Sequence, residues 1–333
     1  MNISVLGAGT WGTALAILLS NNGHEVTLWS KIKREIEALA SDRTTIPNLP
    51  GAVLPDNIQL TYELKDALKA PDIIVSAVAS PYTRETAHAV APFIKPGQII
   101  VNVGKGIEEA TLFTLTEIIS DEIPDADVAV LSGPSHAEEV SRLIPTTCVV
   151  GAKSIKTAKL IQDAFMSESF RVYTSPDVIG IELGGSLKNV IALAAGMADG
   201  LGFGDNTKAA LMTRGIAEIS RLGVKMGGRV ETFAGLSGIG DLVVTCTSKH
   251  SRNHRFGVLV GQGVNVNEAL EAVGTVEGYY ATALAYKLAL QVGAEMPIIS
   301  KCYEVLYQNA NVTEAIKELM LRPIKDEHES LWI

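Results

Sequence analysis

Cysteine is scarce in this sequence, and what there is of it does not form a pattern. The three cysteines, Cys148, Cys246 and Cys302, are far apart and odd in number, so they indicate neither a disulfide framework nor a Cys-x-x-Cys metal pair. A reducing cytoplasm is therefore the expected compartment. The six histidines show no metal-ligand spacing, and we expect no metal. The Gly-x-Ser-x-Gly motif of many serine hydrolases is absent.

Positive charge is also in short supply. The chain has 28 basic and 37 acidic residues, and its net charge of −9 argues against a general affinity for nucleic acid or anionic membranes. An anionic small-molecule substrate would need a local cluster of cations. No apolar stretch looks long and charge-free enough to span a bilayer. The 333 residues, 47% of them hydrophobic, are sufficient for two ordinary globular domains.

Glycine recurs in a regular pattern near the start of the chain. A short apolar run over residues 3–6 leads directly into Gly-Ala-Gly-Thr-Trp-Gly, and a helical pattern follows over residues 13–19. This order of strand, glycines and helix is typical of dinucleotide binding. Gly7 permits the tight turn, Gly9 admits a pyrophosphate, and Gly12 lets helix and strand pack closely. The alternative is a tight turn without a ligand.

The rest of the first half predicts a parallel sheet. Short apolar runs alternate with helical patterns, which is typical of a sheet covered on both faces. These runs are residues 25–29, 58–60, 73–78, 99–103, 128–131, 147–150 and 170–172. We therefore predict an α/β fold with an N-terminal Rossmann-type, doubly wound parallel sheet over residues 1–178.

The residue pattern of the second half differs from that of the first. Long patterns rich in alanine and leucine replace the strand-like runs from about Pro176 onward. Helices are predicted over residues 185–197, 207–222, 266–272 and 282–290. Residues 179–333 are thus predicted to form an all-helical domain, with a substrate cleft between the two domains.

The residues after the second strand bear on the choice of dinucleotide. Sites for NAD usually carry an acidic residue about 20 positions after the glycines, where it binds the ribose hydroxyls. Here the strand ends in Trp29-Ser30-Lys31, with Lys33 and Arg34 close by. Ser30 and Lys31 could accept a 2′-phosphate, which favours NADP over NAD. The alternative is that these cations are a solvated helix start.

Two loops after predicted strands carry candidate polar groups. Lys105 lies between two glycines directly after a strand, on the expected ligand edge of the sheet. Taken alone, an exposed turn lysine is the better interpretation. Gly133 and Ser135 follow the next strand, where they either donate to a ligand or form a turn. His136 is an acid–base candidate, although a lone loop histidine is more often structural.

The predicted helical domain holds the best acid–base candidate. Lys188 and Asn189 interrupt a strongly apolar helix pattern, and burial readily lowers the pKa of a lysine. The alternative is a structural lysine paired with Glu182 or Asp241. Further on, Ser251-Arg252-Asn253 offers a hydroxyl, a guanidinium and an amide that match phosphate oxygens, or else forms a capped helix start.

Taken together, these motifs resemble the NAD(P)-dependent glycerol-3-phosphate dehydrogenases in their bacterial form. The resemblance covers essentially the whole chain, and the ordered set of motifs is highly specific. The motifs are Gly-Ala-Gly-Thr-Trp-Gly-Thr-Ala-Leu-Ala at 7–16, Asn-Leu-Pro-Gly at 48–51, Leu-Pro at 54–55, Lys-Gly-Ile at 105–107, Ser-Gly-Pro-Ser at 132–135, Leu-Lys-Asn at 187–189, Gly-Asp-Leu at 240–242, Thr-Cys-Thr-Ser at 245–248, Ser-Arg-Asn at 251–253 and Val-Glu-Gly at 276–278.

The resemblance implies reversible reduction of dihydroxyacetone phosphate to sn-glycerol 3-phosphate, feeding glycerophospholipid synthesis. It makes Lys188 the acid–base residue, supported by Asp241, with Lys105 contacting both cofactor and substrate. The implied substrate site comprises Lys105, Gly133, Ser135, Lys188, Asp241, Thr245, Ser251, Arg252 and Asn253. The implied cofactor site comprises Gly7, Gly9, Thr10, Trp11, Gly12, Lys31, Lys105, Ala137, Arg252 and Glu277. We also expect a homodimer formed through the helical domain.

Two positions depart from the family pattern. His136 stands where many members have an aromatic residue, and Asn48 where many have tyrosine, which bears on local packing rather than chemistry. Lys31 lies at a variable position, so the resemblance leaves NAD against NADP open. Two other functions compete. One is a two-domain NADP reductase acting on a hydroxy acid or a ketopantoate-like substrate, and the other is a dinucleotide sensor without turnover.

Overall fold

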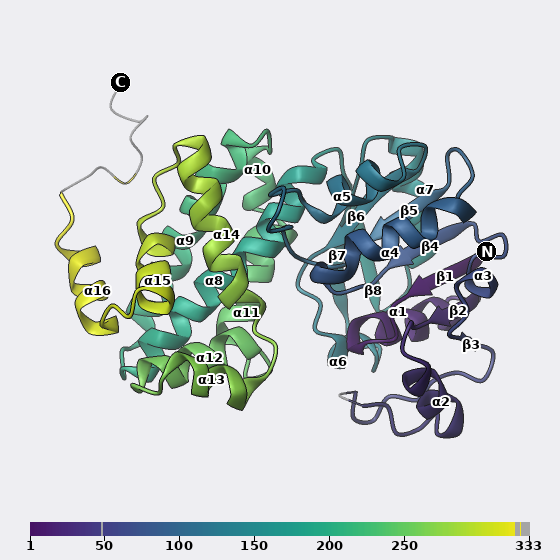
Figure 1. Cartoon of the computed structure of the whole chain (residues 1–333), viewed down its shortest axis with the longest axis horizontal. Coiled ribbons are helices and arrows are strands. Elements are labelled where there is room, and N and C mark those ends of the chain that lie inside the picture. Colours follow the sequence, from purple (N-terminus) through teal and green to yellow (C-terminus); the bar gives the residue numbers. More distant parts are fainter. Residues whose placement is uncertain (48, 324–326, 328–333) are drawn as a thin grey trace.

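A computed structural model gives the structure of the chain and describes residues 1–47, 49–323 and 327. Asn48, one of the two departures from the family pattern, lies outside the described residues, as does most of the chain beyond Pro323. An eight-stranded sheet forms the first half (Figure 1). Its strands are β1 (Asn2–Leu6), β2 (Glu25–Trp29), β3 (Gln59–Thr61), β4 (Ile73–Ser76), β5 (Ile99–Asn102), β6 (Asp127–Ser132), β7 (Thr146–Ala152) and β8 (Phe170–Ser175).

Each of the eight predicted apolar runs forms a strand, but the sheet is not wholly parallel. The strand order is β3-β2-β1-β4-β5-β6-β7-β8, and β7 runs antiparallel to β6 while every other neighbouring pair is parallel. Between β6 and β7 lies only the four-residue helix α6 (Ala137–Val140). A parallel crossover usually needs a longer helix, so β7 starts at the end of the sheet where β6 stops. An apolar run does not encode strand direction.

Helices cover both faces of the sheet, as the doubly wound prediction requires. Alternate residues of one strand serve opposite faces: Val5 packs in the apolar cluster with α1, and Leu6 in the cluster on the other side. One face carries α1 (Thr10–Asn21), α6 and α7 (Ile155–Phe165), and the other α3 (Leu64–Ala67), α4 (Thr83–Val90) and α5 (Leu115–Glu122). The helix α2 (Lys33–Ser41) and the 3₁₀ turns at Ser80–Tyr82 and Ala91–Phe93 complete this half.

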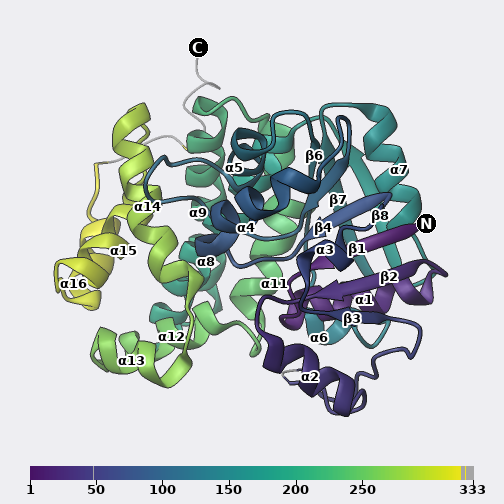
Figure 2. The same ribbon diagram turned by 45° about the vertical axis from the view of Figure 1, so that its right-hand side comes forward.

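The second half is helical and is built around α8 (Val178–Gly200). In two views, α15 and α16 lie on the side away from the sheet (Figure 1 and Figure 2). The other elements are α9 (Asp205–Lys225), α10 (Val230–Phe233), a π-helical turn η3 (Leu236–Gly240), α11 (Asp241–Thr247), α12 (Arg252–Gly261), α13 (Val266–Val273), α14 (Glu277–Val292), α15 (Pro297–Tyr307) and α16 (Val312–Met320).

Helix α8 corrects one expectation from the sequence. By length and hydropathy it is the one helix among the described residues that is apolar enough to cross a membrane, although no such stretch was expected. In the structure, 89% of its apolar window is buried inside the protein. Its hydrophobicity is that of a core helix packed on all sides.

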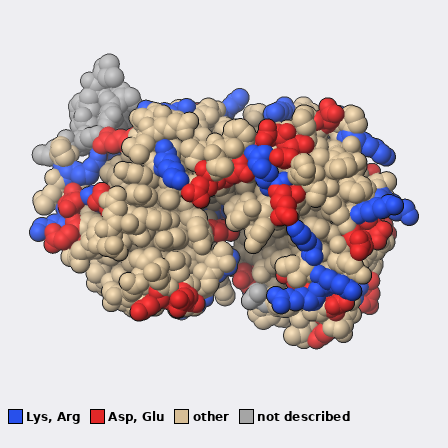
Figure 3. Space-filling model, in the orientation of Figure 1, with Lys and Arg blue, Asp and Glu red and all other residues tan. Residues whose placement is uncertain are grey.

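Glycines let neighbouring elements approach α8 at backbone distance. A Cβ atom on Gly196 of α8 would overlap the carbonyl oxygen of His254, and one on Gly257 of α12 would overlap that of Leu193. This close crossing brings the start of α12 against the middle of α8. Figure 3 shows a hollow between the helical half and the sheet half, with acidic and basic side chains interspersed over this face.

Candidate active site

The first part of the site is the glycine turn between β1 and α1. Gly7 has a φ of +114°, and a Cβ there would lie 2.7 Å from the carbonyl oxygen of Ala77. A Cβ on Gly12 would overlap the carbonyl oxygen of Gly7. Gly9 is exposed, and a Cβ there would meet nothing within 4 Å. The turn is therefore closed on its inner side and open above Gly9, where the N-terminus of α1 begins with Thr10.

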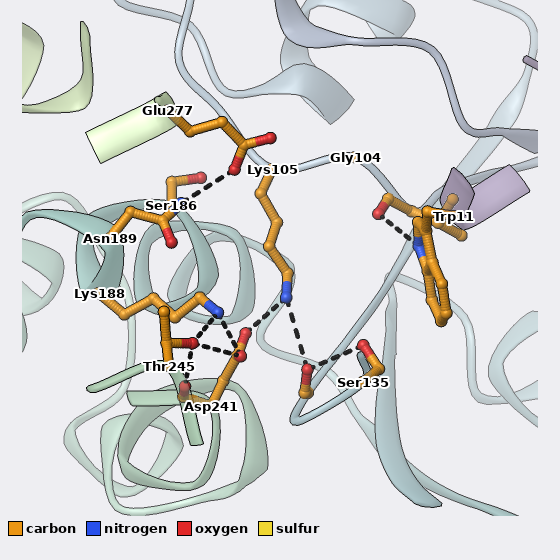
Figure 4. Close-up of polar contacts among 12 residues, drawn as sticks. Trp11, Gly104, Lys105, Ser135, Ser186, Lys188, Asn189, Asp241, Thr245 and Glu277 are labelled. Atoms are coloured by element: carbon orange, nitrogen blue, oxygen red, sulfur yellow. Dashed lines mark hydrogen bonds and ion pairs between the residues drawn. The ribbon is translucent and has the colours of Figure 1, made fainter. Parts of the chain in front are cut away.

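Trp11 connects this turn to the next strand end. Its indole Nε1 donates to the carbonyl oxygen of Val103 at 3.1 Å, two residues before Lys105 (Figure 4). Ala137, another predicted cofactor residue, is half-buried at the first position of α6 and packs against the apolar cluster that contains α1. The glycine turn and the ends of β5 and β6 thus lie along one edge of the sheet.

Three charged side chains form the centre of the site. Asp241 Oδ2 accepts a hydrogen bond from Lys105 Nζ at 2.6 Å, and its Oδ1 accepts one from Lys188 Nζ (Figure 4). Lys188 also donates to Thr245 Oγ1 at 2.5 Å. The side chains of Lys105, Lys188 and Asp241 are 21%, 7% and 2% exposed. One buried carboxylate is shared by two ammonium groups that come from different halves of the chain.

This arrangement shifts the pKa values of the two lysines in opposite directions. Burial lowers the pKa of Lys188 to about 8, helped by the charge of Lys105 and opposed by Asp241. Burial would also lower the pKa of Lys105, but Asp241 outweighs it and leaves that pKa raised. Burial would raise the pKa of Asp241, yet the two ammonium groups hold it below its usual value. At neutral pH the cluster therefore carries a carboxylate and two ammonium groups, of which Lys188 loses its proton more readily.

A chain of amide contacts extends the site along α8. Asn189 Nδ2 donates to Glu277 Oε2 at 3.1 Å, and Asn253 Nδ2 donates to Asn189 Oδ1 at 3.0 Å. Asn253 Oδ1 in turn accepts from the backbone N of Gly278 at 2.7 Å. Asn189 was not among the predicted site residues. Its signal was present in the sequence, as a second polar residue beside Lys188 in an apolar helix.

Of the other predicted substrate residues, Gly133 and Ser135 lie beside Lys105, while Ser251 and Arg252 lie at the start of α12. Ser251 caps α12 by accepting from the backbone N of His254, and Ser135 Oγ donates to the carbonyl oxygen of Gly133 at 3.0 Å. That carbonyl also lies 3.4 Å from Lys105 Nζ. Arg252 is exposed at the first position of α12 and has no ion pair among the residues that the structure describes. A guanidinium without a partner is available to an anionic ligand.

His136 lies at the margin of the same site. Its Nε2 is buried and has no hydrogen-bond partner among the described residues. Its ring centroid is 6.3 Å from that of His250, in the segment before α12. Burial lowers the pKa of His136, and the charge of Lys188 lowers it further. His136 is therefore a neutral imidazole with an unpaired, buried nitrogen, close to a histidine of the helical half.

Lys31 stands apart from these residues. It is exposed and its Nζ contacts Glu85 Oε1 at 2.5 Å, while Ser30 Oγ donates to Glu35 Oε2 at 2.6 Å. The end of β2 thus has two carboxylates nearby, Glu35 and Glu85, which the sequence reasoning did not weigh. No group of three or more His, Cys, Asp or Glu side chains suited to a metal occurs within residues 1–47 and 49–323.

A glycine turn of the dinucleotide type, beside two ammonium groups on a buried carboxylate, defines an oxidoreductase that uses a nicotinamide cofactor. Two family models match the chain. Residues 2–158 match "NAD-dependent glycerol-3-phosphate dehydrogenase N-terminus", and residues 177–317 match the corresponding C-terminus. The chain belongs to the NAD(P)-dependent glycerol-3-phosphate dehydrogenase family.

Individual relatives agree with the family models. The glycerol-3-phosphate dehydrogenase [NAD(P)+] of Agathobacter rectalis is 58% identical over 99% of this chain and 98% of its own length. That of Fusobacterium nucleatum is 54% identical over 99% of both. The crystal structure of the Coxiella burnetii enzyme has a TM-score of 0.90 at 37% identity, covering 96% of this chain and 99% of that one. The chain is thus an NAD(P)-dependent glycerol-3-phosphate dehydrogenase, rather than a reductase of hydroxy-acid or ketopantoate type or a sensor without turnover.

The shared carboxylate leads to a prediction about stability. Asp241→Asn leaves the buried ammonium group of Lys188 and the partly exposed one of Lys105 without their counter-charge, and we expect the free energy of unfolding at pH 7 to fall by about 3 kcal/mol or more. Denaturant titration at pH 7 measures this change. In the control, Glu318→Gln breaks an exposed pair with Lys301 and should cost less than about 1 kcal/mol. Equal losses in the two variants would contradict the prediction.

Proposed function

We propose that this enzyme reduces dihydroxyacetone phosphate reversibly to sn-glycerol 3-phosphate, with Lys188 as the acid–base residue, and supplies glycerophospholipid synthesis. The observation that carries the proposal is the meeting of Lys188 and Lys105 on Asp241. This meeting point lies beside the strand edge that carries the glycine turn. A proton donor and a second cation are thus held next to a dinucleotide turn.

The residues at the strand edge fit a nicotinamide dinucleotide. The bound cofactor would supply the hydride, which is its own chemistry. The open face of Gly9 and the free N–H groups at the start of α1 suit a pyrophosphate. The residues proposed to hold the cofactor are Gly7, Gly9, Thr10, Trp11, Gly12, Lys31, Lys105, Ala137, Arg252 and Glu277.

Substrate orientation follows from the phosphate. Arg252 is exposed at the N-terminus of α12, next to Ser251 and Asn253, so a guanidinium and a helix N-terminus can bind one phosphate together. Binding energy from this remote group then fixes the carbonyl carbon in a reactive position. Gly133, Ser135 and Thr245 complete the proposed substrate site.

Lys188 transfers the proton in the proposed reaction. In the reducing direction, its ammonium donates to the carbonyl oxygen as negative charge grows there, and in reverse the neutral amine accepts the alcohol proton. Lys105 stays charged and stabilises the developing oxyanion. Asp241 orients both ammonium groups by accepting one hydrogen bond from each.

We further propose that NADP is favoured over NAD, that the enzyme is a homodimer, and that it acts in the cytoplasm. Lys31 and Arg34 after β2 support NADP, and no acidic residue ends the strand itself. Large exposed apolar side chains on the helical half, among them Leu290, Met320 and Leu321, support a dimer through that half. The three free cysteines support a reducing compartment.

The lowered pKa of Lys188 predicts opposite pH dependence in the two directions. Reduction needs the protonated amine, so its rate should fall as pH rises through about 8, whereas oxidation should rise over the same range. Lys188→Ala should lower kcat by about a hundredfold and remove both inflections. Steady-state rates from pH 6 to 10 test this, with exposed Lys287→Ala as the matched control. Retained turnover in Lys188→Ala would refute the assigned role.

Arg252 predicts a requirement for phosphate. Oxidation of NADPH and NADH at about 340 nm, where reduced nicotinamide absorbs, should be fast with dihydroxyacetone phosphate and slow with dihydroxyacetone or ketopantoate. Arg252→Ala should raise KM for dihydroxyacetone phosphate at least tenfold, because a charge-assisted contact is lost. Arg255→Ala, an exposed arginine on the same helix, is the control. An equal loss with dihydroxyacetone would argue against phosphate binding by Arg252.

Lys31 predicts the cofactor preference. If it binds the 2′-phosphate, NADPH should give the higher kcat/KM in the wild type, and Lys31→Ala should reduce that advantage about tenfold. NADH is the internal control, since it lacks the 2′-phosphate and its kcat/KM should hardly change. A wild type that prefers NADH, or a variant that weakens both cofactors equally, would contradict this assignment.

A further inference from the structure

One buried carboxylate has no part in the proposed mechanism. Glu182 lies on α8, six residues before Lys188, and is 5% exposed. Its Oε1 accepts from the backbone N of Thr116 at 2.9 Å and from Asn102 Nδ2 at 3.3 Å. Its Oε2 accepts from Thr116 Oγ1 at 2.5 Å. The carboxylate of the helical half thus binds the N-terminus of α5 and the last residue of β5, both in the sheet half.

Asn102 transmits this contact to the loop that carries Lys105. Its Oδ1 accepts from the backbone N of Gly104 at 3.1 Å, and its Nδ2 donates to the carbonyl oxygen of Gly104 at 3.1 Å. The side-chain amide of Asn102 is therefore hydrogen-bonded to both the N–H and the C=O of Gly104, the residue directly before Lys105. Because Glu182 also accepts from that Nδ2, it fixes which way the amide faces.

A second contact from the same helix holds the other side of the loop. The backbone N of Gly106 donates to Ser186 Oγ at 2.9 Å. Glu182 and Ser186 are four residues apart and therefore lie on one face of α8. Lys105 stands between two glycines that α8 holds, Gly104 through Asn102 and Gly106 directly. Glycines give the loop little stiffness of its own, so its conformation depends on these contacts.

We propose that Glu182 is a positioning residue for the reaction, which places the ammonium group of Lys105 on Asp241 by holding Asn102 and the loop at residues 103–106. Helix α8 then carries Lys188 itself and also sets the position of the other ammonium group. The inference rests on the role proposed for Lys105. It predicts that Glu182 affects turnover only by way of that lysine.

The chain offers a closely matched control. Glu218 of α9 is also a buried glutamate, and it accepts from the backbone N atoms of Ile298 and Ile299 at the start of α15. Burial raises the pKa of Glu182 and that of Glu218 to about 7. The two differ in what they hold, since Glu218 has no contact with the Lys105 loop. Substituting either one removes a buried acceptor at a helix N-terminus, but only one substitution should affect the chemistry.

The first experiment compares four variants in the dihydroxyacetone phosphate assay. Glu182→Met, of similar volume, should lower kcat at least tenfold while the Kd for the reduced cofactor changes less than threefold. Glu182→Gln should recover kcat to within about threefold, because its amide oxygen still accepts from Asn102. Glu218→Met should lower Tm without lowering kcat more than about twofold. Asn102→Ala should lower kcat like Glu182→Met, and it serves if Glu182→Met does not fold.

The second experiment separates this inference from the proposed function. In a Lys105→Ala background, adding Glu182→Met or Asn102→Ala should cause no further loss of kcat, because the group they position is gone. If Lys105→Ala alone keeps full turnover, the role of Lys105 fails and the inference fails with it. If Lys105→Ala is slow but Glu182→Met and Asn102→Ala are as fast as wild type, only the inference about Glu182 is overturned. Additive losses in the double variants, or equal kcat losses in Glu182→Met and Glu218→Met, would also overturn it.

Discussion

The site depends on one interaction, the binding of two lysine ammonium groups by the carboxylate of Asp241. Lys105 reaches it from the sheet half and Lys188 from the helical half, and both donate to it. A buried ammonium group is tolerated only with a counter-charge, so each lysine keeps its place because Asp241 is there. The same carboxylate therefore stabilises the contact between the two halves and orients the two lysines that we propose act on the substrate.

Helix α8 provides the frame around that carboxylate. It carries Lys188 and Asn189 on its middle turns, Glu182 against Asn102 at the end of β5, and Ser186 against Gly106, the residue after Lys105. Glycines allow this crowding. A Cβ on Gly185 would lie 2.8 Å from Ser132 Oγ and 3.6 Å from Lys105 Cε. The absence of a side chain at Gly185 therefore leaves room for Lys105. Helix α8 is buried because it is apolar, and burial in turn shifts the pKa values of its ionisable residues, Glu182 and Lys188.

Much of this could be read from the sequence, for reasons that are local. Continuous apolar runs specify buried strands, and Gly7, Gly9 and Gly12 specify the turn that follows the first of them. Lys188 was recognisable because a cation within an apolar helix needs a partner. The direction of β7 and the partner of Lys31 were not recognisable, because both depend on contacts between distant segments. The residue pattern around Lys188 left Glu182 and Asp241 open as its partner, whereas the family resemblance favoured Asp241. The packing of α11 and β5 against α8 brings Asp241 to Lys188 and Glu182 to Asn102.

The two ammonium groups share a partner but have different electrostatic surroundings. Lys188 is the more deeply buried, and the charge of Lys105 disfavours its protonated form. Lys105 is partly exposed and keeps its proton. A pair of equal lysines would give either two fixed charges or two groups competing for one proton. In the proposed mechanism, the unequal pair gives one permanent cation for the developing oxyanion and one group that exchanges a proton near neutral pH, as reversible reduction of a carbonyl requires.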